Sequence, residues 1–443
     1  MKNRTIAVVV ACLILSVLSA QDKASPQATK RLDTLRYGIE TQVIELLDTL
    51  KSEKNIDYAK DILSVFDASS SPKLRVAIFQ YLGAMEQGGA ESRGLAIIGD
   101  RDNQIEVLVQ AAFTYMHTIK SKAALGEAVA ILDEGDKRYM AAAIKTIGGS
   151  GGIQEAEALL KAYEEDDVTQ PIKEAIVLAL GAMKAPNAFE LLSGIASSDE
   201  SSKAIRMYAC TALGDLGDDK AIGVLVRATS ANDPNERAAA VAALGKYSTT
   251  ESRAAIRESL RDAHVLPRIA AAKAVGEQAD VEAIPYLEYK ASYDPEKSVR
   301  EASMKALSDI GGDRVDGFLT DFLSEAKNSM AYRAVAFGAV VSKGGQGARN
   351  KALAAFAAAQ EEKDRSLFTA FARALVVLDD MNVVPFARLM LADKEFSIRL
   401  GALAWAERNA SKALEDTIKT ISETDSNDAV RKRADKALER IGS

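Results

Sequence analysis

Small and apolar residues recur along the chain in one helical pattern that repeats many times. Residues 206–214, 237–245 and 268–276 align without gaps and share the template R-x-x-A-x-x-A-[LV]-G. The first template position recurs at intervals of 31 to 35 residues. A near-constant period of this length indicates a repeat array, so we predict one elongated array instead of two or three ordinary domains. The first positions are Arg75, Val109, Met140, Lys173, Arg206, Arg237, Arg268, Arg300, Arg333, Phe368, Arg399 and Arg431.

The residue spacing inside the template predicts an amphipathic helix. The third position is mostly alanine, and the fifth is apolar in every repeat before the last. This combination lets a neighbouring helix pack closely. A second apolar pattern precedes the template, as in residues 281–287 and 383–390, where Pro285 and Pro385 suit a first helical turn. Each repeat is therefore predicted to be an antiparallel pair, helix A and then helix B, with the template on helix B.

An aspartate stands six residues before the template arginine in four repeats, in the predicted loop between helices A and B. Such a carboxylate can cap helix B or reach the arginine of the next repeat. We interpret the recurring pair as a structural ladder and not as an active site. The predicted ladder consists of Arg206, Arg237, Arg268, Arg300, Arg333, Arg399, Arg431, Asp262, Asp294, Asp393 and Asp425.

These units resemble HEAT repeats, in particular the short HEAT-like type of phycobilisome lyases and many bacterial scaffold proteins. The segment D-P-x-x-x-V-R at residues 294–300 carries the resemblance most clearly. The resemblance implies an all-α solenoid, a right-handed superhelix of about 12–13 helix pairs whose B helices line the concave side. We expect a single array over residues 31–443. Arg433 and Asp435 replace small and apolar residues in the last repeat, which predicts a polar C-terminal cap.

The first twenty residues have the layout of a secretory signal peptide. Lys2 and Arg4 precede the apolar run 6–18, which is too short for a permanent transmembrane helix. We therefore predict a signal peptide at 1–20, a flexible segment at 21–30 and an exported, periplasmic protein. The alternative is a lipid-anchored envelope protein, because residues 9–12 resemble a bacterial lipobox ending at Cys12.

Composition excludes several classes of function. The formal net charge of -7 argues against a general nucleic-acid binder. The only histidines, His117 and His264, cannot build a histidine-rich metal centre, and we expect no metal and no cofactor. Cys210 lies in an apolar helical pattern and is interpreted as a small buried residue. Trp405 occupies a template position that is normally alanine and is interpreted as a packing residue.

The sixth template position is predicted to face solvent on helix B. Lys145, Lys273, Lys305 and Arg373 stand there and would form a broken basic stripe on the concave side. Such a stripe suits an acidic segment of another protein or an anionic polymer. The alternative is that lysine is simply a good exposed helix former.

These observations predict a non-catalytic protein–protein interaction scaffold of the bacterial cell envelope that binds other proteins along a curved surface. Two alternatives remain open. One is an accessory or chaperone enzyme of the bilin-lyase type, and the other is an envelope structural protein that binds an anionic polymer through the basic stripe. The expected partners do not include nucleic acid, and the only expected membrane attachment is the possible lipid anchor at Cys12.

Overall fold

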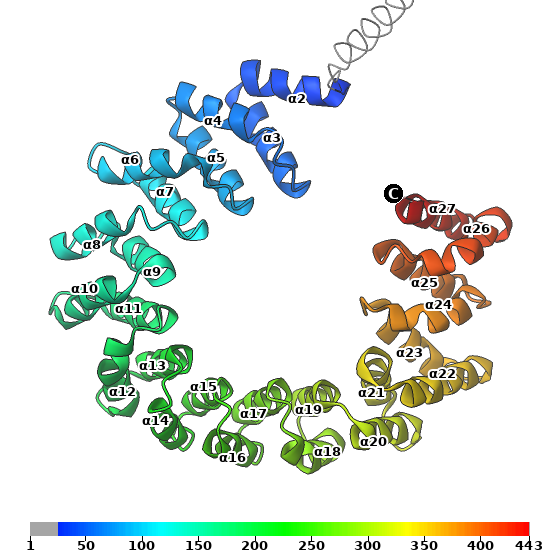
Figure 1. The fold of residues 1–443 in the computed structure, drawn as a ribbon. Helices are drawn as coiled ribbons and strands as arrows, with labels where there is room; N and C mark the ends of the chain where they lie inside the picture. Colours follow the sequence, from blue (N-terminus) through cyan, green and yellow to red (C-terminus); the bar gives the residue numbers. More distant parts are fainter. Residues whose placement is uncertain (1–24, 443) are drawn as a thin grey trace, which may run out of the picture. The chain divides into compact units, whose positions relative to one another are not determined.

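The computed structural model describes residues 25–442, and this part of the chain is built from α-helices and short 3-10 turns without a β-strand. The helices α2 to α27 form thirteen consecutive A–B pairs, which confirms the predicted all-α solenoid of HEAT-like helix pairs. The described residues divide into two compact units, residues 25–188 and 189–442. Figure 1 shows both as stacks of helix pairs.

Unit 1 contains five pairs and two 3-10 turns, η1 (Gly88–Ala90) and η2 (Pro186–Ala188). Its A helices are α2 (Pro26–Tyr37), α4 (Ala59–Ala68), α6 (Glu91–Gly99), α8 (Leu125–Glu134) and α10 (Ile153–Glu164). Its B helices are α3 (Glu40–Ser52), α5 (Pro72–Ala84), α7 (Glu106–Thr118), α9 (Met140–Ser150) and α11 (Gln170–Ala182).

Unit 2 contains eight pairs and three 3-10 turns, η3 (Val281–Ala283), η4 (Met381–Val383) and η5 (Lys412–Leu414). Its A helices are α12 (Phe189–Ser197), α14 (Ala221–Ala228), α16 (Thr250–Ser259), α18 (Ile284–Tyr293), α20 (Asp313–Ser324), α22 (Gln346–Glu361), α24 (Val384–Leu391) and α26 (Glu415–Thr424). Its B helices are α13 (Lys203–Leu216), α15 (Pro234–Leu244), α17 (Val265–Glu277), α19 (Lys297–Ile310), α21 (Met330–Lys343), α23 (Ser366–Val376), α25 (Phe396–Arg408) and α27 (Asp428–Gly442).

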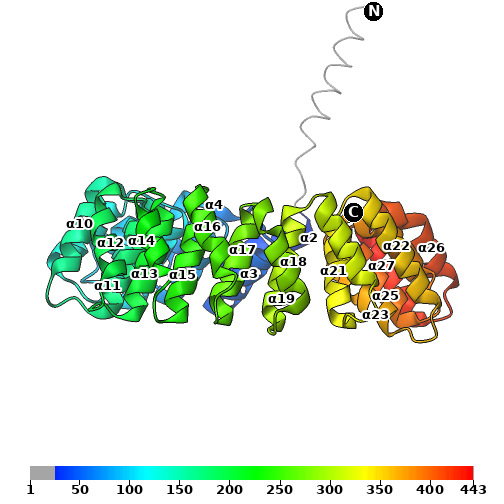
Figure 2. The same cartoon turned by 90° about the horizontal axis from the view of Figure 1, so that it is seen from below.

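Within each unit the A and B helices form two rows. In unit 2 the B helices lie along the inner side of its curve in Figure 1, and Figure 2 shows neighbouring pairs side by side. The core lies between the rows, where Cys210, Val241 and Leu403 of the fifth template column are at most 1% exposed. The predicted template helix is therefore helix B, and its apolar column is buried as expected.

Neighbouring B helices in the middle of unit 2 approach closely through one recurring contact. The ninth template position is glycine, and a Cβ atom at Gly214, Gly245 or Gly276 would lie 2.9 to 3.0 Å from the seventh-position alanine of the next repeat. Real Cβ atoms essentially never lie closer than 3.0 Å to such a neighbour, so a side chain at Gly214 or Gly276 would push the helices apart, and Gly245 stands at this limit. The alanines are Ala243, Ala274 and Ala306.

The same contact is replaced near the C-terminus of unit 2. Val376 stands at the ninth position of α23, and Trp405 stands at the seventh position of α25. Trp405 is 1% exposed, and its indole N–H donates a hydrogen bond to the carbonyl oxygen of Leu378 at 2.7 Å. Helices α23 and α25 pack less closely than α15 and α17. Trp405 is thus the packing residue that the sequence predicted.

The N-terminal end of the described chain differs from the expectation. Helix α2 begins at Pro26, so residues 26–30, which we expected to be part of a flexible segment, are helical because Ser25 caps the helix and proline suits its first turn. At the other end, Asp435 is exposed and Arg433 pairs with Glu407 at 2.8 Å.

The predicted signal peptide and the lipobox cysteine Cys12 lie outside the described residues. Within residues 25–442, none of the helices combines the length and the apolar character that crossing a membrane requires.

Candidate functional site

The sixth template column is the most exposed part of the B helices. Its side chains are exposed in all repeats except at Thr211, Gly338 and Ala404, which are half-buried. None of the twelve residues at this position is Asp or Glu, although the chain holds 63 acidic against 56 basic residues. The column therefore forms, within each unit, a solvent-facing row that lacks negative charge of its own.

Two of the four predicted stripe residues have their charge compensated by their own helix. Lys273 lies 3.8 Å from Glu277, and Lys305 lies 2.6 Å from Asp309. Asp309 also accepts from Lys343. Burial raises the pKa of Asp309, but the hydrogen bonds from the two lysines outweigh it and hold this pKa below its usual value. This part of the stripe therefore presents little net positive charge.

The other two stripe residues have no carboxylate within ion-pair distance in the described part of the chain. Lys145, in unit 1, lies next to the half-buried His117, whose pKa is lowered by burial and by the lysine charge. Arg373, in unit 2, is exposed on α23. Of the predicted broken stripe, two cations are therefore left without a carboxylate partner among the described residues, and they lie in different units.

The arginine ladder joins consecutive repeats through ion pairs. Each bridging arginine donates backward to carbonyl oxygens of its own A–B loop and forward to a carboxylate of the next repeat. Arg237 binds Asp262 through Nε at 2.7 Å and Nη2 at 2.8 Å, and it also reaches the carbonyl of Ala231. Arg268 binds the fully buried carboxylate of Asp294 at 2.8 Å. Arg399 binds Asp425 at 2.7 and 2.9 Å.

The structure corrects the direction and the capping role that we expected for the loop aspartates. Each aspartate pairs with the arginine of the preceding repeat, because the B helices run side by side and the loop of the next repeat lies above the previous template arginine. The carboxylate of each aspartate also accepts a hydrogen bond from the backbone N–H two residues later. This bond forms an Asx turn in the loop before helix B, so the aspartate is not the N-cap of that helix. The pairs are Asp262 with His264, Asp294 with Glu296, Asp393 with Glu395 and Asp425 with Asn427.

The ladder is not uniform along unit 2. Arg206 binds Glu236 instead of an aspartate, at 2.7 and 2.9 Å. Arg300 lies over the ring of Tyr332, and Arg333 donates to the carbonyl of Leu323 at 2.6 Å. Neither of these two has a carboxylate partner among the described residues.

One ladder step was missed by the sequence reasoning. Phe368 stands at the template arginine position, but Arg365, one helical turn earlier, binds Asp393 at 2.5 Å and lies over the Phe368 ring at 4.6 Å. The guanidinium is thus supplied from a shifted position. An arginine three residues before an aromatic substitution was the available signal. Arg431, which lies in the last helix, binds only its own loop and Asp428.

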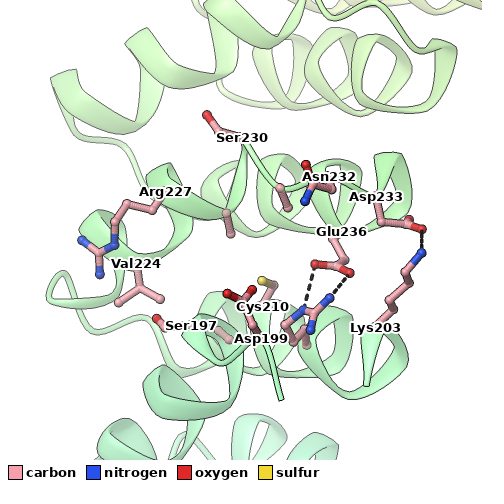
Figure 3. A pocket seen from close by; sticks show the side chains of 14 residues that line it. Ser197, Asp199, Lys203, Cys210, Val224, Arg227, Ser230, Asn232, Asp233 and Glu236 are labelled. Carbon is pink, nitrogen blue, oxygen red and sulfur yellow. Dashed lines mark hydrogen bonds and ion pairs between the residues drawn. The ribbon is translucent and has the colours of Figure 1, made fainter. Parts of the chain in front are cut away.

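A polar pocket of about 390 Å³ opens between the first two repeats of unit 2, at the ladder pair of Arg206 and Glu236 (Figure 3). Four of its charged side chains form two ion pairs, Lys203 with Asp233 at 3.1 Å and Arg206 with Glu236 at 2.7 Å. Cys210 also lines it. Burial raises the pKa of the Cys210 thiol to about 12, so the thiol stays protonated at neutral pH, as the interpretation of a buried small residue requires.

The two histidines have separate surroundings. His264 is the N-cap of α17, where its Nδ1 accepts from the backbone N–H of Leu266 at 3.3 Å. His117 lies in unit 1. Within the described residues, no cluster of three or more His, Cys, Asp or Glu side chains is arranged to hold a metal ion.

The solved structures that are similar to this chain include three with a TM-score below 0.5. The complex of CpcE and CpcF of phycocyanin lyase from Nostoc has 19% identity and a TM-score of 0.33, covering 65% of this chain and 94% of that one. Human deoxyhypusine hydroxylase with glycerol has 18% identity and a TM-score of 0.27, covering 64% and 95%. A Kap121p mutant has 12% identity and a TM-score of 0.43, covering 99% of this chain and 57% of that one.

None of the curated proteins matches the sequence. The family described as "Spirochaete HEAT repeat protein" matches residues 35–437, which is nearly all of the helical array. The repeat period, the helix pairs and the buried template columns agree with that match. The chain therefore belongs to the spirochaete HEAT repeat protein family.

Proposed function

We propose that this protein is a non-catalytic scaffold of the bacterial cell envelope that binds other proteins along the row of its B helices. The observation that supports this most is the exposed sixth column, which is free of acidic residues and stands on helices held by the ladder. Stability resides in the buried columns and in the ladder, so the exposed row is available for contacts with a partner. The scaffold is exported to the periplasm after removal of residues 1–20.

The alternative of an envelope protein that binds an anionic polymer is less favoured by the charges. Lys273 and Lys305 are paired with Glu277 and Asp309, so a polymer would have to displace these carboxylates. Phosphate-rich or carboxylate-rich polymers are bound by uncompensated cations. The bilin-lyase type of accessory enzyme is the remaining alternative, and it predicts a chromophore that copurifies with the protein.

Cross-linking of the exported chain in intact cells tests the scaffold proposal. We expect defined protein partners whose cross-links map to exposed sixth-column residues of several B helices. Because the contacts are distributed, a single substitution in this column should weaken capture of the partner only modestly. Retention on cell-wall material that the Lys273→Glu and Lys305→Glu variant loses, without a protein partner, would contradict the proposal.

Fractionation tests the location. The proposal expects the protein in the periplasmic fraction with its N-terminus near residue 21. A mature N-terminus at Met1 or Lys2 contradicts export by a signal peptide, and a lipid on Cys12 supports the anchored alternative.

A further inference from the structure

An apolar groove lies between α23 and α25 on the B-helix row of unit 2. It has a volume of about 410 Å³, within the range of ligand pockets. Its floor is formed by Val376, Met390, Ile398 and Gly401, and Met390 is 1% exposed. The groove is therefore separate from the polar pocket of Figure 3 and from the ladder.

The groove follows from two departures from the repeat template. Val376 and Trp405 replace the glycine and alanine through which other B helices approach, and the bulk of both side chains fits the looser packing of α23 on α25. Gly401 stands in the third column, which is mostly alanine. A Cβ at this position would lie 3.3 Å from Val376 Cγ2 and 3.8 Å from Met390 Cε, inside the floor of the groove.

The rim of the groove carries donors without a partner. Arg373 is exposed and makes no hydrogen bond or ion pair with the described residues. The hydroxyl groups of Thr369 and Ser397 also border the groove. A guanidinium binds a carboxylate through two parallel N–H donors, so the groove combines an apolar floor with a site for one negative charge.

We infer that this groove binds the C-terminal residue of a partner protein, with an aliphatic side chain on the floor and the terminal carboxylate on Arg373. A C-terminal residue carries both groups on one Cα atom, which suits a groove whose cation, Arg373, and whose floor residue Val376 lie one turn apart on α23. This inference rests on the proposed scaffold function and assigns the chemistry of one contact.

A labelled peptide tests the inference on the full mature chain. The probe is a fluorescein-labelled peptide that ends in leucine with a free carboxylate, followed by fluorescence anisotropy. We expect saturable binding, with at least about tenfold weaker binding when the carboxylate is replaced by an amide or the last residue by serine. Trp405, the single tryptophan of the chain, stands one helical turn after Gly401 on α25, and its fluorescence gives a second, label-free signal with the unlabelled peptide.

Three variants locate the binding. Arg373→Gln should weaken it at least about tenfold, because Arg373 is exposed and its replacement leaves the core intact. Gly401→Leu should abolish it by filling the floor. Lys351→Gln, which removes an exposed cation from α22 in the A row, should leave it unchanged. Thermal melting confirms that each variant is folded.

Several outcomes overturn the inference. They are no saturable binding, equal binding of the acid and amide peptides, an unchanged affinity in Arg373→Gln, or competition by octanoate at lower concentration than by the peptide, which indicates a lipid ligand. If cross-linked partners persist in the Arg373→Gln variant, the groove inference fails while the scaffold proposal stands. If no protein partner is found at all, the scaffold proposal itself fails.

Discussion

The middle and the end of unit 2 are built on the same period but join their B helices differently. From α13 to α19, a ninth-position glycine touches a seventh-position alanine, and the helices approach to the limit that a missing Cβ allows. Between α23 and α25 the corresponding residues are Val376 and Trp405, and Gly401 appears on the floor of a groove. Small residues at the contact thus let neighbouring B helices pack closely, whereas large residues accompany a groove between them that is large enough for a ligand.

The ladder shows the same contrast. In the middle, Arg268 comes from the template position and binds a buried carboxylate of the next repeat. At the end, Phe368 fills the template position and Arg365 binds Asp393 from one turn earlier. The pairing of repeats is thus kept while the row surface changes, which is how a repeat array can vary its binding face without losing its fold.

The largest expected effect comes from removing Trp405. We expect Trp405→Ala to lower the free energy of unfolding by about 3–5 kcal/mol, because a fully buried ring leaves a cavity and the carbonyl of Leu378 loses its donor. Urea denaturation measures the loss, and hydrogen exchange should rise in α23 and α25 but not in α13 and α15. A loss below about 1 kcal/mol would show that the ring does not support this junction.

A double variant sharpens that result. Val376→Gly combined with Trp405→Ala restores the residue types of the middle junctions. We expect the double variant to lose less stability than the sum of the two single variants, because the helices can then close together. Strict additivity would contradict the role given to these two residues.

Removing one ladder carboxylate should lower the free energy of unfolding by about 3 kcal/mol, both in the middle and at the end of unit 2. Asp294→Ala leaves the buried Arg268 without its counter-charge, and Asp393→Ala does the same to Arg365. Similar losses in urea denaturation would show that the shifted arginine replaces the template one fully. Asp428→Ala, at an exposed ion pair, is the matched control and should leave stability nearly unchanged.

Adding one methyl group where two B helices meet in the middle of unit 2 should lower the free energy of unfolding by about 1–2 kcal/mol. A Cβ at Gly276 meets the Cα atom of Ala306 at 2.9 Å, so Gly276→Ala forces α17 and α19 apart despite the better helix propensity of alanine. In Gly317→Ala the new methyl group meets nothing within 4 Å, and stability should rise by up to about 1 kcal/mol. Opposite signs in thermal melting are the expected result.

The smallest expected effect is a pH dependence shared by both regions. Arg237 lowers the pKa of Asp262 by hydrogen bonding, and for Asp425 the burial that raises its pKa is outweighed by Arg399. A lowered folded-state pKa stabilises the fold above the ordinary aspartate range near 4, and this stabilisation disappears as pH falls through the lowered value. The stability gap between wild type and Asp262→Asn or Asp425→Asn should therefore shrink in acid. A gap that widens would contradict the pairing.

Much of the architecture could be predicted from the sequence because helix pairs are local. The spacing of Ala240, Val241 and Leu244 is enough to indicate a buried helix face, and a constant period implies stacking of like units. The buried state of Cys210 and the packing role of Trp405 followed from their template positions. The sixth column was correctly placed on the surface for the same reason.

The candidate site was predicted less well because it depends on contacts between repeats. The sequence alone suggested a basic stripe, but Glu277 and Asp309 compensate two of its lysines. It also placed each loop aspartate toward the next repeat, whereas the carboxylate meets the arginine of the preceding one. Two features could not be located without the packing of α23 on α25. They are the pairing of Arg365 in place of a template arginine, and the groove beside Gly401.

By itself, the sequence determined the helix pairs, their order and the buried columns, since backbone hydrogen bonds and apolar faces are set within one repeat. Only the tertiary structure decided which arginine meets which carboxylate, which cations stay free and where a row of helices opens. These features depend on the distance between helices that lie about thirty residues apart in the chain, and that distance is set by side-chain volume at their junction.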